Sequence, residues 1–209
     1  MSDTYQNFED LSANEVRGED YDIRTKHRKK DLIVLTIHGG GIEGGASELT
    51  LETATQLEEA FNSSYYIFDA IKSSGNTALH ITSTHFDEPE ALEMVAEAEY
   101  CVSYHGYSDS VKNTKIGGAD TELMQLALEK LTEAGFNAEI LSAGGAISGS
   151  EADNICNRTS RGKGLQLEIS TAQRKAMFDT FTLANRKNTQ NEEFYRYVQA
   201  IVDALLEVA

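Results

Sequence analysis

Residues 32–43 read LIVLTIHGGGIE, and no other stretch of the chain says more about its fold. The first six residues form an unbroken apolar, largely β-branched run, which is typical of a strand buried on both faces of a sheet. The run leads directly into His38 and three glycines, and Glu43 follows. We therefore expect a central strand that delivers polar groups to the carboxyl edge of a sheet.

Strands and helices are predicted to alternate along most of the remaining chain. Further strands are expected at residues 65–68, 78–82, 100–104, 138–141 and 164–169. Helices are expected at residues 47–61, from Pro89 onward, at 121–133 and at 191–208. This order predicts an α/β fold with three layers, in which helices cover both faces of a mainly parallel or mixed sheet.

Length and composition indicate one globular unit. A chain of 209 residues can bury a sufficient core without a disulfide or a structural metal, and no internal repeat is visible. We expect residues 1–209 to form a single catalytic domain. Cys101 and Cys156 lie far apart in sequence, which favours two reduced thiols. The formal net charge of −16 argues against nucleic acid or an anionic membrane as a partner.

The sequence carries no visible targeting segment. No apolar run reaches transmembrane length, and the acidic residues 1–10 lack the basic and apolar regions of a signal peptide. We expect a protein that is cytoplasmic when synthesised. Release by cell lysis leaves no trace in a sequence, so action outside the cell after lysis is compatible with this expectation.

Three predicted strands end in polar residues that can meet. The first delivers His38 and Glu43, the second ends at His105, and the third contains Glu168. Ligands of open α/β sheets bind beyond the carboxyl ends of the strands, so these side chains are expected in one crevice. Two imidazoles and a carboxylate supply three metal ligands, and a further carboxylate can take a proton from water. The pattern indicates a metal-dependent hydrolase.

The HGGG motif also occurs in esterases, where its backbone N–H groups line an oxyanion hole. That chemistry needs a GxSxG nucleophile elbow, followed along the chain by an acid and a histidine. This chain has no GxSxG, and no histidine follows His105. The sequence therefore argues against a serine triad.

The polar motifs, taken together and in order, resemble one protein family. They are His38-Gly-Gly-Gly-Ile-Glu43, Thr82-Ser-Thr-His85-Phe-Asp-Glu-Pro89, Tyr104-His105-Gly106, Asn157-Arg158 and Leu165-Gln-Leu-Glu168. From about residue 20 to its end, the chain resembles the bacteriophage poly-γ-glutamate hydrolases and their prophage homologues in bacilli. The resemblance implies a zinc-carboxypeptidase-like fold, one bound Zn²⁺, and a monomer. It also implies endo-type cleavage of γ-glutamyl amide bonds in poly-γ-glutamate, which strips the host capsule during infection.

The resemblance also implies roles for single residues. His38, Glu43 and His105 match the metal ligands of the family, and Glu168 matches its general base. Arg158, with the preceding Asn157, looks like the pair that zinc carboxypeptidases place near the substrate carboxylate. Two departures put the duty of Arg158 in question. The pair follows His105 instead of preceding the second histidine, and the first ligand motif is HxxxxE instead of HxxE.

A basic segment surrounds the proposed catalytic carboxylate. Between Asn157 and Lys175 stand Arg158, Arg161, Lys163, Arg174 and Lys175, with Glu168 as the sole acid. An anionic polymer needs such a segment, and the arginine fork can grip a carboxylate with two parallel hydrogen bonds. Asn157, Arg161 and Lys163 are therefore expected to bind substrate. The alternative is a basic loop that pairs with acidic helices.

Three further residues are candidates for contacts with substrate. His80 and His85 can bind substrate, orient a metal ligand through a hydrogen bond, or serve only the fold. Tyr104 can donate a hydrogen bond to a tetrahedral intermediate, and core packing is its alternative role.

Two other functions are compatible with the same residues. A zinc amidohydrolase or carboxypeptidase that acts on small N-acyl amino acids or cell-wall peptides uses the same chemistry. A non-catalytic, metal-containing protein that binds the polymer needs the same ligands. Cleavage of poly-γ-glutamate, compared with cleavage of the smaller amides, separates the three.

Overall fold

The computed structural model describes residues 3–28 and 31–208. In these residues seven strands form one sheet in the order β1-β3-β2-β4-β7-β5-β6. Their bounds are β1 Tyr21–Lys26, β2 Leu32–Gly40, β3 Ser64–Ala70, β4 Tyr100–Tyr107, β5 Thr114–Gly118, β6 Ala138–Ile140 and β7 Leu165–Ser170. β3, β2, β4 and β7 run parallel, whereas β1 and β5 are antiparallel to β3 and β7. The predicted mixed sheet is confirmed.

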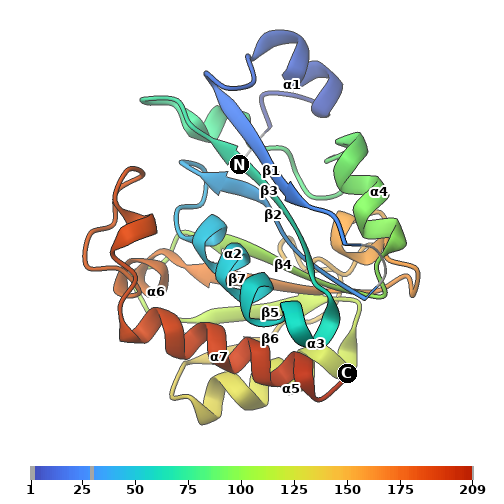
Figure 1. Ribbon diagram of the computed structural model, residues 1–209, viewed down its shortest axis with the longest axis vertical. Coiled ribbons are helices and arrows are strands. Elements are labelled where there is room, and N and C mark those ends of the chain that lie inside the picture. The colour runs from blue at the N-terminus through green and yellow to red at the C-terminus, as the bar shows by residue number, and fades with distance from the viewer. Residues whose placement is uncertain (1–2, 29–30, 209) are drawn as a thin grey trace.

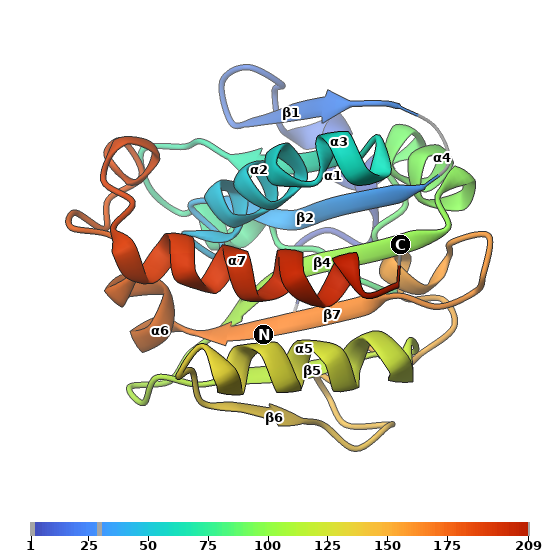
Figure 2. The same ribbon diagram turned by 60° about the horizontal axis from the view of Figure 1, so that its bottom comes forward.

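Helices cover both faces of this sheet (Figures 1 and 2). One face carries α2 (Ala46–Gln56), α3 (Glu58–Phe61), α5 (Thr121–Glu133) and α7 (Glu192–Leu206). The other face carries α1 (Phe8–Asn14) and α4 (Pro89–Glu97). The short α6 (Thr171–Ala176) follows β7, and 3₁₀ turns lie at η1 (Asn76–Leu79), η2 (Ile155–Asn157) and η3 (Arg186–Asn188). The predicted α/β architecture with three layers is therefore confirmed.

β2 is the central strand that its apolar sequence predicts. Every residue of the strand is buried. Leu32 and Val34 pack into the core beneath α2, α5 and α7, whereas Ile33, Leu35 and Ile37 pack into the opposite core beside α1 and α4. Alternate side chains of a strand point to opposite faces, so a strand covered on both sides needs apolar residues at every position.

Several element predictions differ from the structure. Residues 78–82 form no strand, because Leu79 and Ile81 reach the core from the 3₁₀ turn η1 and the segment after it. The predicted helix at residues 47–61 is divided at Leu57 into α2 and α3. β1 and β5 were not expected. β5 ends in two glycines, and a Cβ at Gly117 would lie 2.1 Å from the Ser148 carbonyl oxygen.

The order of the strands creates a crevice at the carboxyl end of β2. After β2 the chain crosses to β3 on one side, and it later returns to place β4 on the other side. Chains that leave neighbouring strands in opposite directions open a gap at the edge of the sheet, where ligands of α/β proteins bind. His38 and His105 lie at this gap.

None of the helices formed by residues 3–28 and 31–208 is long and apolar enough to cross a membrane.

The start of α7 provides a test of the packing on the first face. The Asn191 side chain accepts hydrogen bonds from the backbone N–H groups of Glu193 (3.0 Å) and Phe194 (3.3 Å). Asn191→Ala should lower the free energy of unfolding by about 1 kcal/mol, because these helical N–H groups lose their acceptor. Urea denaturation measures the change. Gln199→Ala, at an exposed position of the same helix, should cost less than about 0.5 kcal/mol, and equal losses would contradict the assignment.

Candidate functional site

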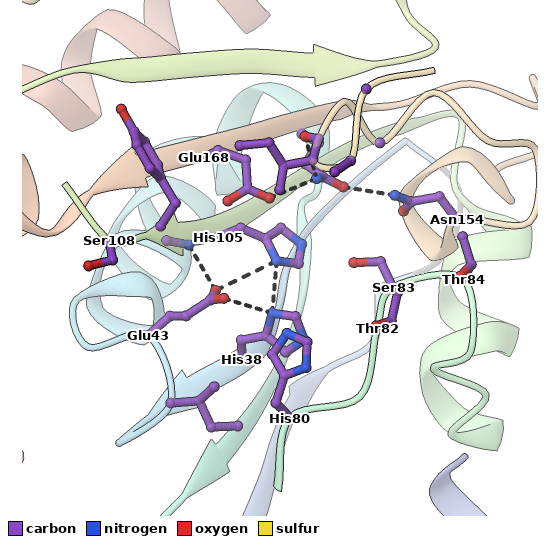
Figure 3. A pocket seen from close by; sticks show the side chains of 18 of the residues that line it. His38, Glu43, His80, Thr82, Ser83, Thr84, His105, Ser108, Asn154 and Glu168 are labelled. Carbon is purple, nitrogen blue, oxygen red and sulfur yellow. Dashed lines mark hydrogen bonds and ion pairs between the residues drawn. The ribbon is translucent and has the colours of Figure 1, made fainter. Parts of the chain in front are cut away.

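His38, Glu43 and His105 point toward one another at the carboxyl ends of β2 and β4 (Figure 3). The Nδ1 atoms of the two histidines are 3.0 Å apart. Glu43 Oε1 lies 3.1 Å from His38 Nδ1, and Glu43 Oε2 lies 3.6 Å from His105 Nδ1. Ligand atoms that surround a tetrahedral zinc ion at about 2.0–2.1 Å are about 3.3 Å from one another. The three observed separations bracket that value, so the cluster has the dimensions of a zinc site.

The hydrogen bonds of the two rings determine what each Nδ1 offers. His38 Nε2 lies 2.9 Å from the Ile81 carbonyl oxygen. A carbonyl only accepts, so Nε2 carries the proton, and Nδ1 of the neutral ring presents a lone pair to the cluster. His105 Nε2 lies 2.7 Å from Ser103 Oγ, a hydroxyl that can accept the Nε2 proton when Nδ1 faces a cation. Two ring nitrogens and a carboxylate therefore converge, and a cation satisfies all three acceptors at once.

The electrostatics of the cluster favour a bound cation. Burial opposes the charge on Glu43, yet the neighbouring imidazoles of His38 and His105 hold the pKa of this carboxyl far below its ordinary value. Burial also opposes a charge on His38, but Glu43 and the Ile81 carbonyl together raise the pKa of that imidazole. The partly buried Glu43 carboxylate is thus stabilised by positive charge beside it.

Glycines fold the ligand loop tightly enough for Glu43 to reach back to His38. The backbone N–H of Glu43 donates to the His38 carbonyl (2.9 Å), and the Gly106 N–H donates to Glu43 Oε2 (2.8 Å). Gly40 has a φ of +63°, and a Cβ at this position would lie 2.3 Å from the Ala70 carbonyl oxygen. A side chain here would have to adopt a left-handed backbone and collide with β3.

Glu168 faces the cluster from the neighbouring strand. It pairs in register with His105 across β4 and β7, and its side chain is buried. Gln166 Nε2 donates to Glu168 Oε1 (2.9 Å), and Asn154 Nδ2 donates to Gln166 Oε1 (2.8 Å), so the orientation of the Gln166 amide is fixed. Burial raises the pKa of Glu168 above its ordinary value, although the charge of His105 acts in the opposite direction.

A cavity of about 640 Å³ opens over these groups. Besides the metal-site residues, Glu168 and Gln166, its polar lining comprises Thr77, His80, Thr82, Ser83, Thr84, Tyr107, Ser108, Glu151, Asn154, Thr171 and Arg174. Residues 144–147 and 149 also line it. A pocket of this size, with a few converging polar groups, is typical of a ligand site.

The two remaining histidine candidates occupy different places. His80 lines the cavity and stacks on His38, with ring centroids 4.0 Å apart, and its Nδ1 lies 2.7 Å from Asp3 Oδ1. The ligand atoms of His38, Glu43 and His80 lie within 4.8 Å of one another, so His80 is near enough to contact a metal or a substrate beside it. His85 instead lies by a second hollow, which is lined by Asp3, Tyr5 and Gln6 as well.

Tyr104 does not reach the site, and its predicted contact with substrate is wrong. The side chain is fully buried in the core beneath α2, and its hydroxyl lies 2.8 Å from Thr53 Oγ1. The physical reason is the alternation of a strand, because successive side chains of β4 point to opposite faces and His105 takes the other one.

Asn157 and Arg158 also lie outside the cavity, which corrects the expectation of an Asn-Arg pair beside the substrate. Asn157 is buried, and its side chain ties together the backbones of Ala119, Gly149 and Gly164. Arg158 Nε donates to the Asp153 carbonyl oxygen (2.9 Å). Both side chains organise the loop before β7.

Two residues of the predicted basic groove form ion pairs within the protein instead. Arg161 Nη1 lies 3.0 Å from Asp120 Oδ2, and Lys163 Nζ lies 3.4 Å from Asp120 Oδ1. The arginine also covers the ring of Tyr100, with 4.2 Å between its Cζ and the ring centroid. Neither residue lines the cavity. The alternative of a basic loop paired with acid therefore applies to Arg161 and Lys163, and the cavity takes its basic side chain from Arg174.

Comparison with known proteins identifies the family. The sequence pattern described as poly-gamma-glutamate hydrolase matches residues 5–200. The chain belongs to this family. The prophage-derived UPF0714 protein YoqZ of Bacillus subtilis is 43% identical over 206 residues, which are 99% of this chain and 73% of YoqZ.

Two solved structures of similar proteins share the fold over their whole length. A bacteriophage poly-gamma-glutamate hydrolase is 42% identical, with a TM-score of 0.92 over 99% of this chain and 98% of that one. The zinc-free apo form of YndL is 42% identical, with a TM-score of 0.90 over 99% of both chains. The resemblance noted in the sequence motifs is therefore confirmed at the level of the family.

The ligand loop yields a prediction that uses two glycines with similar backbones. Gly40 and Gly162 both have positive φ, +63° and +69°, but a Cβ at Gly162 would meet no atom within 4 Å. Gly162→Ala should cost about 1–2 kcal/mol of unfolding free energy from backbone strain alone. Gly40→Ala should cost more and should also lower the zinc content of the purified protein, because the loop must shift. Urea denaturation and metal analysis measure both, and equal losses with unchanged zinc would contradict this account of the loop.

Proposed function

We propose that this protein is a zinc-dependent hydrolase that cleaves γ-glutamyl amide bonds within poly-γ-glutamate. The main support is the arrangement of the metal-ligand cluster and Glu168 in a chain that belongs to this family. The three-ligand cluster of His38, Glu43 and His105 faces the buried carboxylate of Glu168 across a single cavity. The family match to residues 5–200 supports a single catalytic domain, and we propose that this domain acts as a monomer.

His38, Glu43 and His105 would hold the zinc ion through Nδ1, a carboxylate and Nδ1. When bound, the ion supplies Lewis acidity, which polarises an amide carbonyl and favours the loss of a proton from water. The protein contributes the orientation of the ligands. Ile81 and Ser103 fix the two rings, and the Gly106 N–H fixes the Glu43 carboxylate. Such contacts keep the ligands in place before a metal arrives.

Glu168 is the proposed general base. It takes the proton from the water molecule that attacks the amide carbonyl, and it passes that proton to the amine nitrogen as the C–N bond breaks. A raised carboxyl pKa suits both steps, because the group must hold the proton briefly and then release it. Gln166 holds one carboxylate oxygen of Glu168 in place.

The proposed substrate determines whether the protein acts inside or outside the cell. Poly-γ-glutamate of a bacterial capsule lies outside the cell, so we propose that the protein reaches it after lysis of the host. Cleavage of small N-acyl amino acids would need no such release. Comparing both substrates at equal enzyme concentration tests this part of the proposal.

The division of labour between Glu168 and the ligands can be tested by substitution. Glu168→Gln should lower the rate of polymer cleavage by about 10³-fold or more while zinc binding persists, because the proton acceptor is lost and the ligands remain. His105→Ala should remove both zinc and activity, and a chelator should do the same to the unaltered protein. Viscosity of a polymer solution and metal analysis give the two readouts.

A matched control is Glu59→Gln, which neutralises an exposed glutamate on α3 and should leave both readouts unchanged. Near-normal cleavage by Glu168→Gln would show that the base lies elsewhere. Intact polymer after long incubation with the zinc-loaded, unaltered protein would favour a binding protein without catalysis.

Gln166 gives a prediction about pH. Its N–H stabilises the ionised form of Glu168, so removing it should raise the pKa of the carboxyl further above its ordinary value. A base is inactive below its pKa, so the acidic limb of kcat/KM should move to higher pH in Gln166→Met, by about one unit. Asn154→Ala, which only frees the Gln166 amide to rotate, should give a smaller shift in the same direction. A move of the limb to lower pH would contradict the assigned role of Gln166.

A further inference from the structure

We propose that Arg174 is the specificity-determining residue of the cavity and receives an α-carboxylate of the substrate chain beside the bond that is cleaved. This inference rests on the proposed function, because it names the group of the polymer that the protein recognises. A γ-linked glutamate chain keeps a free α-carboxylate on every residue. A neutral amide of similar length offers no such group.

Arg174 is distinguished first by its position. Among the described residues, it is the one arginine or lysine that lines the cavity. The other charged side chains of the lining are the carboxylates of Glu43, Glu151 and Glu168. An anionic polymer that enters this space needs a fixed positive charge besides the metal, and Arg174 provides it.

The second observation is that the Arg174 guanidinium is held rigidly. Its Nε donates to the Ile169 carbonyl oxygen (3.0 Å), Nη1 to the Gly44 carbonyl oxygen (2.8 Å) and Nη2 to Thr171 Oγ1 (3.3 Å). A Cβ at Gly106 would lie 2.4 Å from Arg174 Cζ, so the guanidinium lies directly against the backbone that follows His105. These bonds use three of the five guanidinium N–H groups, which leaves one on each terminal nitrogen.

The third observation concerns charge. Arg174 is buried, yet its hydrogen bonds within the described residues go to neutral oxygens and none of the ion pairs there includes it. The other buried arginine near this loop, Arg186, lies 3.4 Å from Glu48 Oε1. A buried charge is costly unless it is paired. Burial lowers the pKa of Arg174, although the carboxylates of Glu43 and Glu168 act in the opposite direction without forming an ion pair with it. A substrate carboxylate would give Arg174 a directly hydrogen-bonded, oppositely charged partner.

The test uses two γ-linked glutamate oligomers that differ at one point. In the first all α-carboxylates are free, and in the second those of the residues flanking the scissile bond are primary amides. Arg174→Gln should lower kcat/KM for the free acid by about 100-fold and for the amide by less than about threefold, because only the first substrate loses a charge-assisted contact. For the free-acid oligomer, Arg174→Lys should give a kcat/KM between those of Arg174→Gln and the unaltered protein. Lysine keeps the positive charge but lacks the two-pronged guanidinium.

Arg186→Gln is the matched control. Arg186 also donates to a carbonyl oxygen of the ligand loop, that of Gly40 (2.6 Å), but it does not line the cavity. Its replacement should affect both oligomers equally. Zinc content and melting temperature show whether each variant keeps its metal and its fold.

A second readout does not depend on turnover. Binding of the free-acid oligomer to Glu168→Gln, measured by calorimetry, should weaken by about tenfold or more when Arg174→Gln is added. Equal losses on both oligomers, or unchanged binding, would overturn the inference and make Arg174 a structural brace. Failure of the unaltered protein to cleave either oligomer would instead overturn the proposed function, and this inference with it.

Discussion

The site depends on one constraint, which is that the partly buried carboxylate of Glu43 must lie beside two imidazole nitrogens. Two neighbouring parallel strands deliver the rings, and a glycine-rich loop returns Glu43 to the first of them. Three features of the surrounding structure serve this arrangement. The buried, apolar β2 fixes the position of His38 along the strand. The reversal of strand order at β2 opens the gap, and Gly40 allows the ligand loop to approach β3. Without positive charge, three acceptors at these distances would repel one another.

Sequence patterns predicted the structure correctly where it depends on residues that are close together in the chain. The unbroken apolar run predicted β2, the helical spacing predicted α5 at its observed bounds, and the polar ends of three strands predicted which side chains would meet. β1 shows the alternation of an antiparallel edge strand, with Tyr21 and Ile23 buried, and could have been found. β5 could not, because its two glycines are explained only by backbone from distant segments that approaches them.

The errors about basic residues have one geometric cause. Arg161 and Lys163 precede β7, whereas Arg174 follows it. A strand rises about 3.3 Å per residue, so the two ends of this six-residue strand lie at opposite edges of the sheet. Closeness to Glu168 in the sequence is therefore a poor guide to closeness in the structure. The end of β7 at which a residue lies is the better guide. Asn154 and Gln166 were missed for a related reason, since their amide contacts join a loop to a strand.

Arg174 is the one arginine among the described residues that line the cavity, and this has a consequence for how protein and polymer meet. With a net charge of −16, the protein repels a polyanion at long range, while Arg174 attracts only at contact distance. Dissolved salt weakens the distant repulsion beyond about 8 Å far more than it weakens a buried contact. Encounter between the two is therefore favoured by ionic strength, opposite to the behaviour of proteins that draw in their substrates by opposite charge. Selectivity for the polymer therefore arises after docking, not during approach.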